Sequence, residues 1–150
     1  MLPGTQFQPV FPDAGRSAND VERVILMSGK LYYDLVKERA ARGLEGRVAI
    51  VRIEELAPFP FFQLADVLRP YTRSSKDVEW VWVQEEPRNQ GAWSHVKDRL
   101  EVMLKELSNV REGTVRYVGR REDAVPVVAI GQVYQVQQKA VVDDAFAGLY

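Results

Sequence analysis

The 150-residue sequence has no cysteine, a single histidine and almost no net charge, with 20 basic against 21 acidic residues. The lack of cysteine rules out a disulfide framework, a thiol nucleophile or a thiolate zinc site, and it fits a reducing compartment. Balanced charge argues against a nucleic-acid binder, which normally carries a basic excess. No apolar run reaches the roughly 18 residues that a membrane-spanning helix needs. We therefore expect neither a nucleic-acid nor a membrane partner.

The single histidine, His95, restricts the chemistry further. A catalytic relay needs a nucleophile and an orienting carboxylate within reach of the imidazole, and the sequence ties neither to His95. One histidine without cysteine also makes a poor transition-metal site. We predict a surface or helix-capping role for His95, and neither a metal site nor a catalytic residue in this chain.

What is present is enough apolar surface for one domain, since 46% of the residues are hydrophobic. Residues 1–20 are punctuated by proline and have no targeting pattern, so we expect an arm or linker that continues from an upstream domain. Phe7, Val10 and Phe11 are more apolar than a free tail needs, and we expect them to lie against a surface. The domain itself is predicted over 21–150.

Strand and helix patterns alternate through that domain. Buried strands are predicted at 24–27, 47–53, 78–84 and 114–118, with 124–130 as a further candidate, and helices at 31–42, 61–68, 93–107 and 133–147. Ser28 is a good N-cap for the first helix, and Pro70 limits the second. Continuous apolar strands separated by helices indicate a three-layer α/β domain with helices on both faces of a mostly parallel sheet of four or five strands.

The strand that ends near residue 84 is followed by a dense run of polar residues. Ligands and partners of open α/β sheets bind beside the carboxyl ends of strands. We predict an interface role for this run, with a helix-capping turn as the alternative: Glu85, Glu86, Asn89, Gln90, Gly91. A second acidic pair, Glu54 with Glu55, is expected to be solvated and paired with Arg52 or Arg88.

A second candidate is Ser28-Gly29-Lys30, between the first strand and its helix. Free N–H groups at a helix N-terminus, together with a lysine, favour an anion such as phosphate. The glycine spacings of a P-loop and of a dinucleotide turn are both absent, which argues against a free-standing nucleotide-binding domain. A plain capping turn is the alternative.

Five blocks in chain order resemble one family. They are the Ser-Gly-Lys-Leu-Tyr-Tyr segment within 27–35, the segments 48–56 and 58–60, the Gln-Glu-Glu-Pro-x-Asn-Gln-Gly-Ala-Trp segment at 84–93, Tyr117-x-Gly-Arg120, and Pro126-x-x-Ala-x-Gly131. Together they are similar to the C-terminal domain of the thiamine-diphosphate-dependent component of 2-oxoglutarate dehydrogenase, or of the related 2-oxoadipate dehydrogenase.

The resemblance implies a transketolase C-terminal-like domain that supports a homodimer. In the full enzyme, thiamine diphosphate and magnesium are bound by upstream domains, where a 2-oxo acid is decarboxylated and the acyl group passes to a lipoyl carrier. The implied partners are those domains, a lipoyl acyltransferase and dihydrolipoyl dehydrogenase. The implied location is the mitochondrial matrix in a eukaryote and the cytoplasm in a bacterium.

Some members of the family bind acetyl-CoA as an effector between this domain and its neighbour, and we expect Ser28, Gly29 and Lys30 to form part of such a pocket. Relatives often carry a histidine shortly after the segment that ends at Gly131, where this chain has Val133 and Tyr134. The role of that histidine therefore does not transfer. An interaction or effector-binding module without catalysis is the functional alternative from another class.

Overall fold

The computed structural model describes residues 6–14, 17–74, 77–108, 114–124 and 131–149. Its elements follow in this order: β1 (Val10–Phe11), the 3₁₀ turn η1 (Ala18–Asp20), β2 (Arg23–Met27), α1 (Leu31–Ala41), β3 (Val48–Ile53), α2 (Phe61–Thr72), β4 (Glu79–Pro87), α3 (Trp93–Ser108), β5 (Val115–Arg120) and α4 (Gly131–Ala145). Strands and helices alternate as the apolar pattern predicts.

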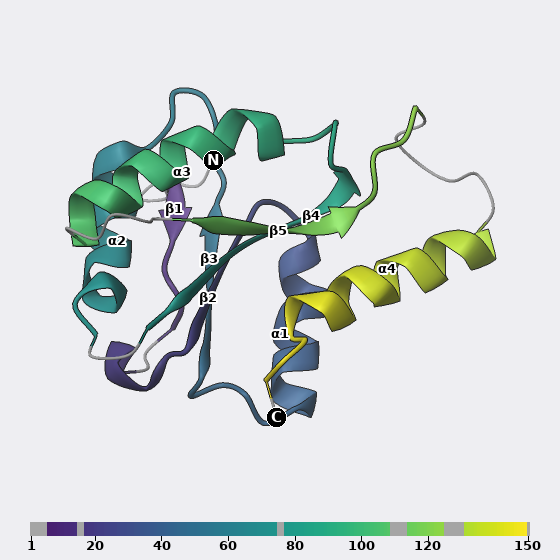
Figure 1. Cartoon of the computed structure of the whole chain (residues 1–150), viewed down its shortest axis with the longest axis horizontal. Coiled ribbons are helices and arrows are strands. Elements are labelled where there is room, and N and C mark those ends of the chain that lie inside the picture. Colours follow the sequence, from purple (N-terminus) through teal and green to yellow (C-terminus); the bar gives the residue numbers. More distant parts are fainter. Residues whose placement is uncertain (1–5, 15–16, 75–76, 109–113, 125–130, 150) are drawn as a thin grey trace.

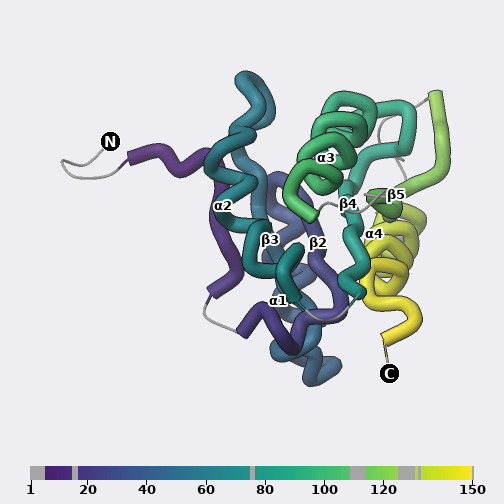
Figure 2. Tube along the Cα trace, turned by 60° about the vertical axis from the view of Figure 1, so that its left-hand side comes forward, coloured from purple at the N-terminus to yellow at the C-terminus, as the bar shows by residue number. Residues whose placement is uncertain are grey.

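The strands form one five-stranded sheet in the order β1-β3-β2-β4-β5. The pairs β2–β3, β2–β4 and β4–β5 are parallel, and Ile25 at the centre faces Ile50 on one side and Val81 on the other. Helices α2 and α3 cover one face of the sheet, and α1 and α4 cover the other (Figures 1 and 2). The structure thus confirms the three-layer architecture.

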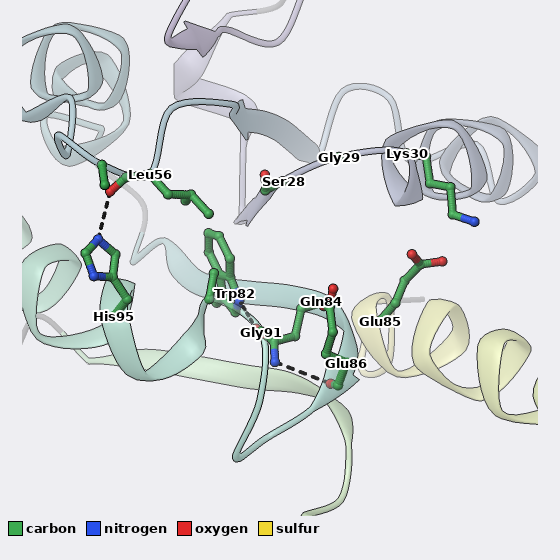
Figure 3. A pocket seen from close by; sticks show the side chains of 12 residues that line it. Ser28, Gly29, Lys30, Leu56, Trp82, Gln84, Glu85, Glu86, Gly91 and His95 are labelled. Carbon is green, nitrogen blue, oxygen red and sulfur yellow. Dashed lines mark hydrogen bonds between the residues drawn. The ribbon is translucent and has the colours of Figure 1, made fainter. Parts of the chain in front are cut away.

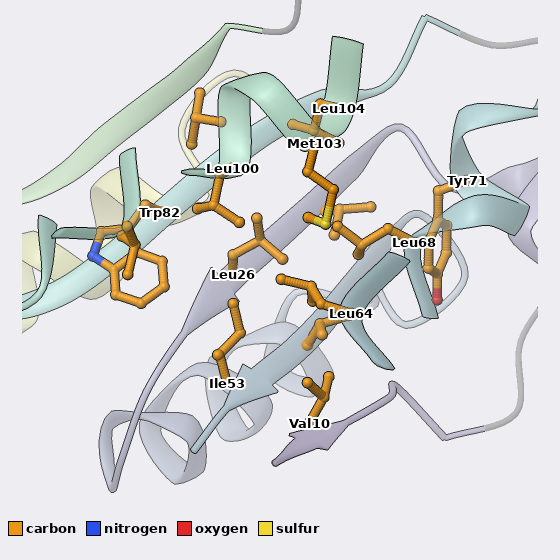
Figure 4. Close-up of a cluster of buried hydrophobic side chains, with 14 of the residues drawn as sticks. Val10, Leu26, Ile53, Leu64, Leu68, Tyr71, Trp82, Leu100, Met103 and Leu104 are labelled. Atoms are coloured by element: carbon orange, nitrogen blue, oxygen red, sulfur yellow. The ribbon is translucent and has the colours of Figure 1, made fainter. Parts of the chain in front are cut away.

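Each face of the sheet has its own apolar core. The α2/α3 side gathers side chains such as Leu26, Leu64 and Leu100, with Trp82 at one side of the cluster (Figure 4). The other side gathers Ile25, Leu35 and Phe146, together with alternate positions of the same strands. Because successive side chains of a strand point to opposite faces, β4 sends Trp80 and Trp82 to one core and Val81 and Val83 to the other.

An ion-pair network closes the amino-terminal edge of the sheet. Arg23, only 4% exposed, donates from Nε to Glu79 Oε2 at 2.6 Å and from Nη1 and Nη2 to the carbonyls of Ala145 and Ala147 at 2.7 and 2.8 Å. Burial alone would raise the pKa of Glu79, but the hydrogen bonds and charges of Arg116 and Arg23 outweigh it and lower that pKa. The guanidinium of Arg23 therefore ties β2 to β4 and to the carboxyl end of α4.

Part of the N-terminal arm belongs to the sheet. Val10 pairs with Ile53 in an antiparallel register and is buried, and Arg52 lies 4.4 Å from the centre of the Phe11 ring. Phe7, by contrast, is 59% exposed. A two-residue strand is too short to show an apolar period, so the sequence alone predicts only an extended arm. The division of the chain at residue 20 stays a prediction.

Three further boundaries differ from those predicted. Helix α2 runs through Pro70 to Thr72. The proline removes one backbone N–H from the last turn, but burial of the Tyr71 side chain stabilises that turn. Strand β4 continues to Pro87 instead of ending at residue 84. The N-cap of α1 is Lys30 and not Ser28, with no side-chain capping bond. The candidate strand at 124–130 lies outside the described residues, apart from residue 124.

Replacement of Arg23 by methionine should lower the free energy of unfolding by about 2–4 kcal/mol, because the buried Ala145 carbonyl and the part-buried Ala147 carbonyl lose a charged donor and Glu79 loses one of its arginines. Urea unfolding followed by circular dichroism measures this loss. Arg69→Met, at an exposed ion pair on α2, is the control and should cost less than about 1 kcal/mol. Equal losses in the two variants would contradict the structural role given to Arg23.

Candidate functional site

The two groups of residues predicted from the sequence line one pocket. Its volume is about 470 Å³, and it lies at the carboxyl ends of β2, β3 and β4. Ser28, Gly29 and Lys30 form one wall, and Glu85, Glu86 and Gly91 form the other, over a floor that includes Trp82 and Leu56 (Figure 3). Asn89 and Gln90, the other predicted interface residues, are not among the lining residues.

A buried amide, that of Gln84, shapes this pocket. Its Oε1 accepts hydrogen bonds from Trp82 Nε1 at 3.0 Å and from the backbone N–H of Trp93 at 2.9 Å. Its Nε2 donates to the carbonyl of Gln90 at 2.8 Å and lies 3.1 and 3.3 Å from those of Pro87 and Glu86. One side chain thus connects the end of β4, the following loop and the first residue of α3.

The loop that Gln84 holds begins in an irregular strand. Val83 pairs with Val118, and the next registered pair is Pro87 with Arg120, so β4 has extra residues opposite β5. Such an irregularity re-aims the side chains of the bulged strand, here into the pocket. Gly91 has φ +65°, and a Cβ atom there would lie 3.0 Å from Gln84 Nε2. Only glycine fits that position without strain.

The two carboxylates of the loop have different surroundings. Glu85 Oε1 accepts a hydrogen bond from Gln138 Nε2 at 2.8 Å and lies 3.5 Å from the Tyr134 hydroxyl, so α4 holds it in place. The side chain of Glu86 is exposed and has no hydrogen-bond or ion-pair partner within the described part of the chain. The pair therefore does not act as a proton-sharing dyad, as expected for adjacent strand residues.

The Ser28–Lys30 turn is stabilised by a carboxylate of this chain. Gly29, at φ +80°, donates its N–H to Glu54 Oε1 at 3.4 Å, and Glu54 lies 3.8 Å from Arg52 Nε. The predicted pairing of Glu54 with Arg52 is therefore confirmed. In Figure 3 the Lys30 and Glu85 side chains lie at the same end of the pocket, one on each wall. The pocket thus offers one cation and two carboxylates to a ligand.

His95 borders the same pocket and has a structural contact. Its Nε2 lies 2.7 Å from the Leu56 carbonyl, and its ring packs near Phe59 at a centroid distance of 6.4 Å. It therefore joins α3 to the connector after β3, and it is neither a free surface residue nor a helix cap. No group of histidine, aspartate and glutamate that could hold a metal occurs in the described residues.

Asn89 and Gln90 contact a neighbouring loop of the same chain. The side-chain amides of both residues donate to the Asp123 carbonyl, at 3.0 and 2.9 Å, and the Asp123 N–H donates to Asn89 Oδ1 at 3.1 Å. The backbone N–H of Arg88 also donates to the carbonyl of Arg120 at 3.1 Å. These bonds fix the loop after β4 to the turn after β5, a role that sequence reasoning missed.

The fold places the chain in a structural class. A solved structure described as "Split gene transketolase, inactive beta4 tetramer" matches 97% of this chain and 43% of its own, with a TM-score of 0.53 and 19% identity. This likeness concerns the fold alone, which is that of a transketolase-type α/β domain. None of the described helices is long and apolar enough to cross a membrane.

Sequence comparison defines the family. Residues 1–146 match the family described as "2-oxoglutarate dehydrogenase C-terminal". The chain is 43% identical over 141 residues to a 2-oxoglutarate dehydrogenase E1 component from Azotobacter vinelandii, and 38% identical over 149 residues to a mitochondrial 2-oxoglutarate dehydrogenase-like protein from Pongo abelii. The matches cover 93% and 97% of this chain but 14% of each relative. The chain belongs to the 2-oxoglutarate dehydrogenase C-terminal family.

Replacement of Gln84 by leucine should lower the free energy of unfolding by about 2–4 kcal/mol, because it leaves two buried N–H groups and the loop carbonyls without their partner. Urea unfolding, followed through tryptophan fluorescence, measures this loss. The matched control is Gln135→Leu, at an exposed position of α4, which should stay within about 0.5 kcal/mol. Similar stability of the two variants would show that Gln84 does not hold the loop.

Proposed function

We propose that this chain acts as the C-terminal, dimer-supporting domain of a 2-oxo acid dehydrogenase of the succinyl-transferring, 2-oxoglutarate type. The family match over residues 1–146 carries this proposal. The match covers only 14% of the Azotobacter vinelandii relative, which supports a role as one part of a longer enzyme. In the pocket, His95 and Gln84 form hydrogen bonds within the fold, which supports a structural role for both side chains. The reactive groups of the enzyme would then belong to its other domains.

In the complete enzyme, thiamine diphosphate with magnesium would supply the chemistry that decarboxylates the 2-oxo acid, and a lipoyl carrier would accept the acyl group. Neither cofactor is assigned a residue of this chain. The partners would be the upstream domains, a second copy of the enzyme, the lipoyl acyltransferase and dihydrolipoyl dehydrogenase. The relatives include mitochondrial and bacterial proteins, so the location would be the mitochondrial matrix or the bacterial cytoplasm.

A 2-oxoadipate dehydrogenase is the nearest alternative. A relative from Dictyostelium discoideum, named a probable 2-oxoadipate dehydrogenase complex component E1 homolog, is 36% identical over 148 residues. Its identity is close to that of the 2-oxoglutarate relatives, so a substrate difference leaves little trace in this domain. Substrate choice would then be made in the upstream domains.

We also propose that the pocket between Lys30 and Glu85 binds an effector of the enzyme, with acetyl-CoA as the candidate. The side chain of Lys30 has no ion pair among the described residues, and the N-terminus of α1 adds a positive dipole beside it. Glu85, which α4 holds in place, faces Lys30 across the pocket. An anionic group would bind beside Lys30, and polar groups of the effector would contact the opposite wall.

A domain exchange tests the main proposal. The matching region of the Azotobacter vinelandii E1 component is replaced by this chain, and 2-oxoglutarate-dependent turnover of the reassembled complex is measured. We expect the chimera to retain activity and to dimerise, whereas an enzyme with the region deleted should do neither. The 150-residue chain alone should show no turnover, and no thiamine diphosphate binding by calorimetry in the presence of magnesium. Turnover by the isolated chain would contradict the proposal.

Replacement of Lys30 by alanine in the same chimera tests the effector pocket. If Lys30 binds the anionic part of the effector, the acetyl-CoA concentration that gives half of the full response should rise about tenfold, the loss expected for one charge-assisted contact. Basal activity should not change. The control is Lys37→Ala, at an exposed position of α1 that does not line the pocket. An unchanged response of Lys30→Ala would remove this pocket from consideration.

A further inference from the structure

Three arginines share a hollow on the other side of the loop after β4. The hollow has a volume of about 320 Å³ and is lined by Arg88, Arg120 and Arg121 together with Tyr117, Gly119 and Glu122. None of these six residues lines the pocket beside Lys30. The hollow is therefore a separate feature of the surface, with three guanidinium groups against one carboxylate.

These arginines differ from most others in the molecule. Within the described residues, seven arginines each lie within 4.0 Å of a carboxylate: Arg23, Arg39, Arg42, Arg47, Arg52, Arg69 and Arg116. Arg88, Arg120 and Arg121 make no ion pair with any described residue. Like charges that share a hollow repel one another, so three unpaired guanidinium groups there favour a bound anion.

Arg120 is the least exposed of the three arginines. Its guanidinium lies over the Tyr134 ring at 5.0 Å from the centroid, and its Nε and Nη2 atoms are buried without a hydrogen-bond partner in the described part of the chain. Buried donors of this kind are normally satisfied by an acceptor. An oxyanion in the hollow would place a negative charge beside this guanidinium.

The backbone that carries the arginines is braced from several sides. The Tyr117 hydroxyl lies 3.0 Å from the carbonyl of Arg120 and 3.1 Å from that of Glu86, and burial raises the pKa of Tyr117 to about 12. A Cβ atom at Gly119 would overlap the Tyr117 hydroxyl and would lie 2.9 Å from the Gln84 carbonyl oxygen, so only glycine allows this packing. The hydrogen bonds from Asn89 and Gln90 to the Asp123 carbonyl fix the turn after β5, which carries Arg121. The arginines thus stand on a preorganised frame.

We infer that this hollow, which we call the arginine hollow, binds the phosphate group of a small-molecule ligand. A single carboxylate can be satisfied by one arginine through a bidentate contact, whereas three guanidinium groups match the several oxygens and the double charge of a phosphate. Because the frame is already in place, binding needs little ordering of the loops. The site is independent of the effector pocket proposed above.

Pyrophosphate is the probe, titrated into the 150-residue chain at low salt and followed by calorimetry and by NMR shifts of backbone amides. We expect saturable binding that weakens as salt is raised, with the largest shifts at the residues lining the arginine hollow. Arg120→Gln should weaken binding at least tenfold. The matched control, Arg69→Gln, removes the same charge at an exposed position of α2 and should leave the affinity within twofold.

A second variant separates binding from folding. Arg88→Gln combined with Arg121→Gln changes two exposed residues, so it should keep the thermal unfolding midpoint and still weaken pyrophosphate binding at least tenfold.

Absence of pyrophosphate binding, equal losses in Arg120→Gln and Arg69→Gln, or tighter binding of citrate than of pyrophosphate would each overturn the inference. Lys30→Ala should have no effect here, so failure of the effector proposal is told apart from failure of this one.

Discussion

The site depends on the complete hydrogen bonding of one buried amide. Gln84 is 4% exposed, and an amide buried there without hydrogen-bond partners would lower the stability of the fold. Its partners lie on the strand before it, the loop after it and the helix that follows. The positions of these three segments are therefore not independent, and the wall of the pocket beside Lys30 takes its shape from them. Gly91 is needed because the amide occupies the space a side chain would fill.

A second buried polar group performs the corresponding task at the opposite edge of the sheet. Arg23 connects β2, β4 and the end of α4, and its partner Glu79 also binds Arg116 on β5. The apolar cores lie between these two edges. Their stabilisation depends on the apolar area that is buried and has no preferred direction, so it does not by itself fix the relative positions of the segments. The two polar side chains supply direction, because hydrogen bonds to a guanidinium or an amide require fixed positions. Strand β4 is thus fixed at both of its ends, by Glu79 and by Gln84.

The same construction supports a charged surface at the carboxyl ends of the central strands. The loops after β4 and β5 present carboxylates on one side and arginines on the other, and both sets stand on braced backbone. Such a surface can bind charged ligands or neighbouring segments with little loss of conformational entropy. The transketolase-type fold thus provides a rigid support, and its edge provides specific charges. In this family the relatives extend far beyond the region that the domain covers.

The sequence by itself determined the layered architecture, because continuous apolar strands and helical periods depend only on which residues must be buried. It also determined the family, and it singled out Ser28–Lys30 and Glu85–Gly91 at the carboxyl edge of the sheet. Only the tertiary structure decided that these two groups share a pocket, while Asn89 and Gln90 bind the turn at Asp123. It also decided that Val10–Phe11 adds an edge strand and that Arg88 and Arg120 meet. Such contacts join residues far apart in the chain, and they arise from the pairing of whole strands, so no local pattern records them.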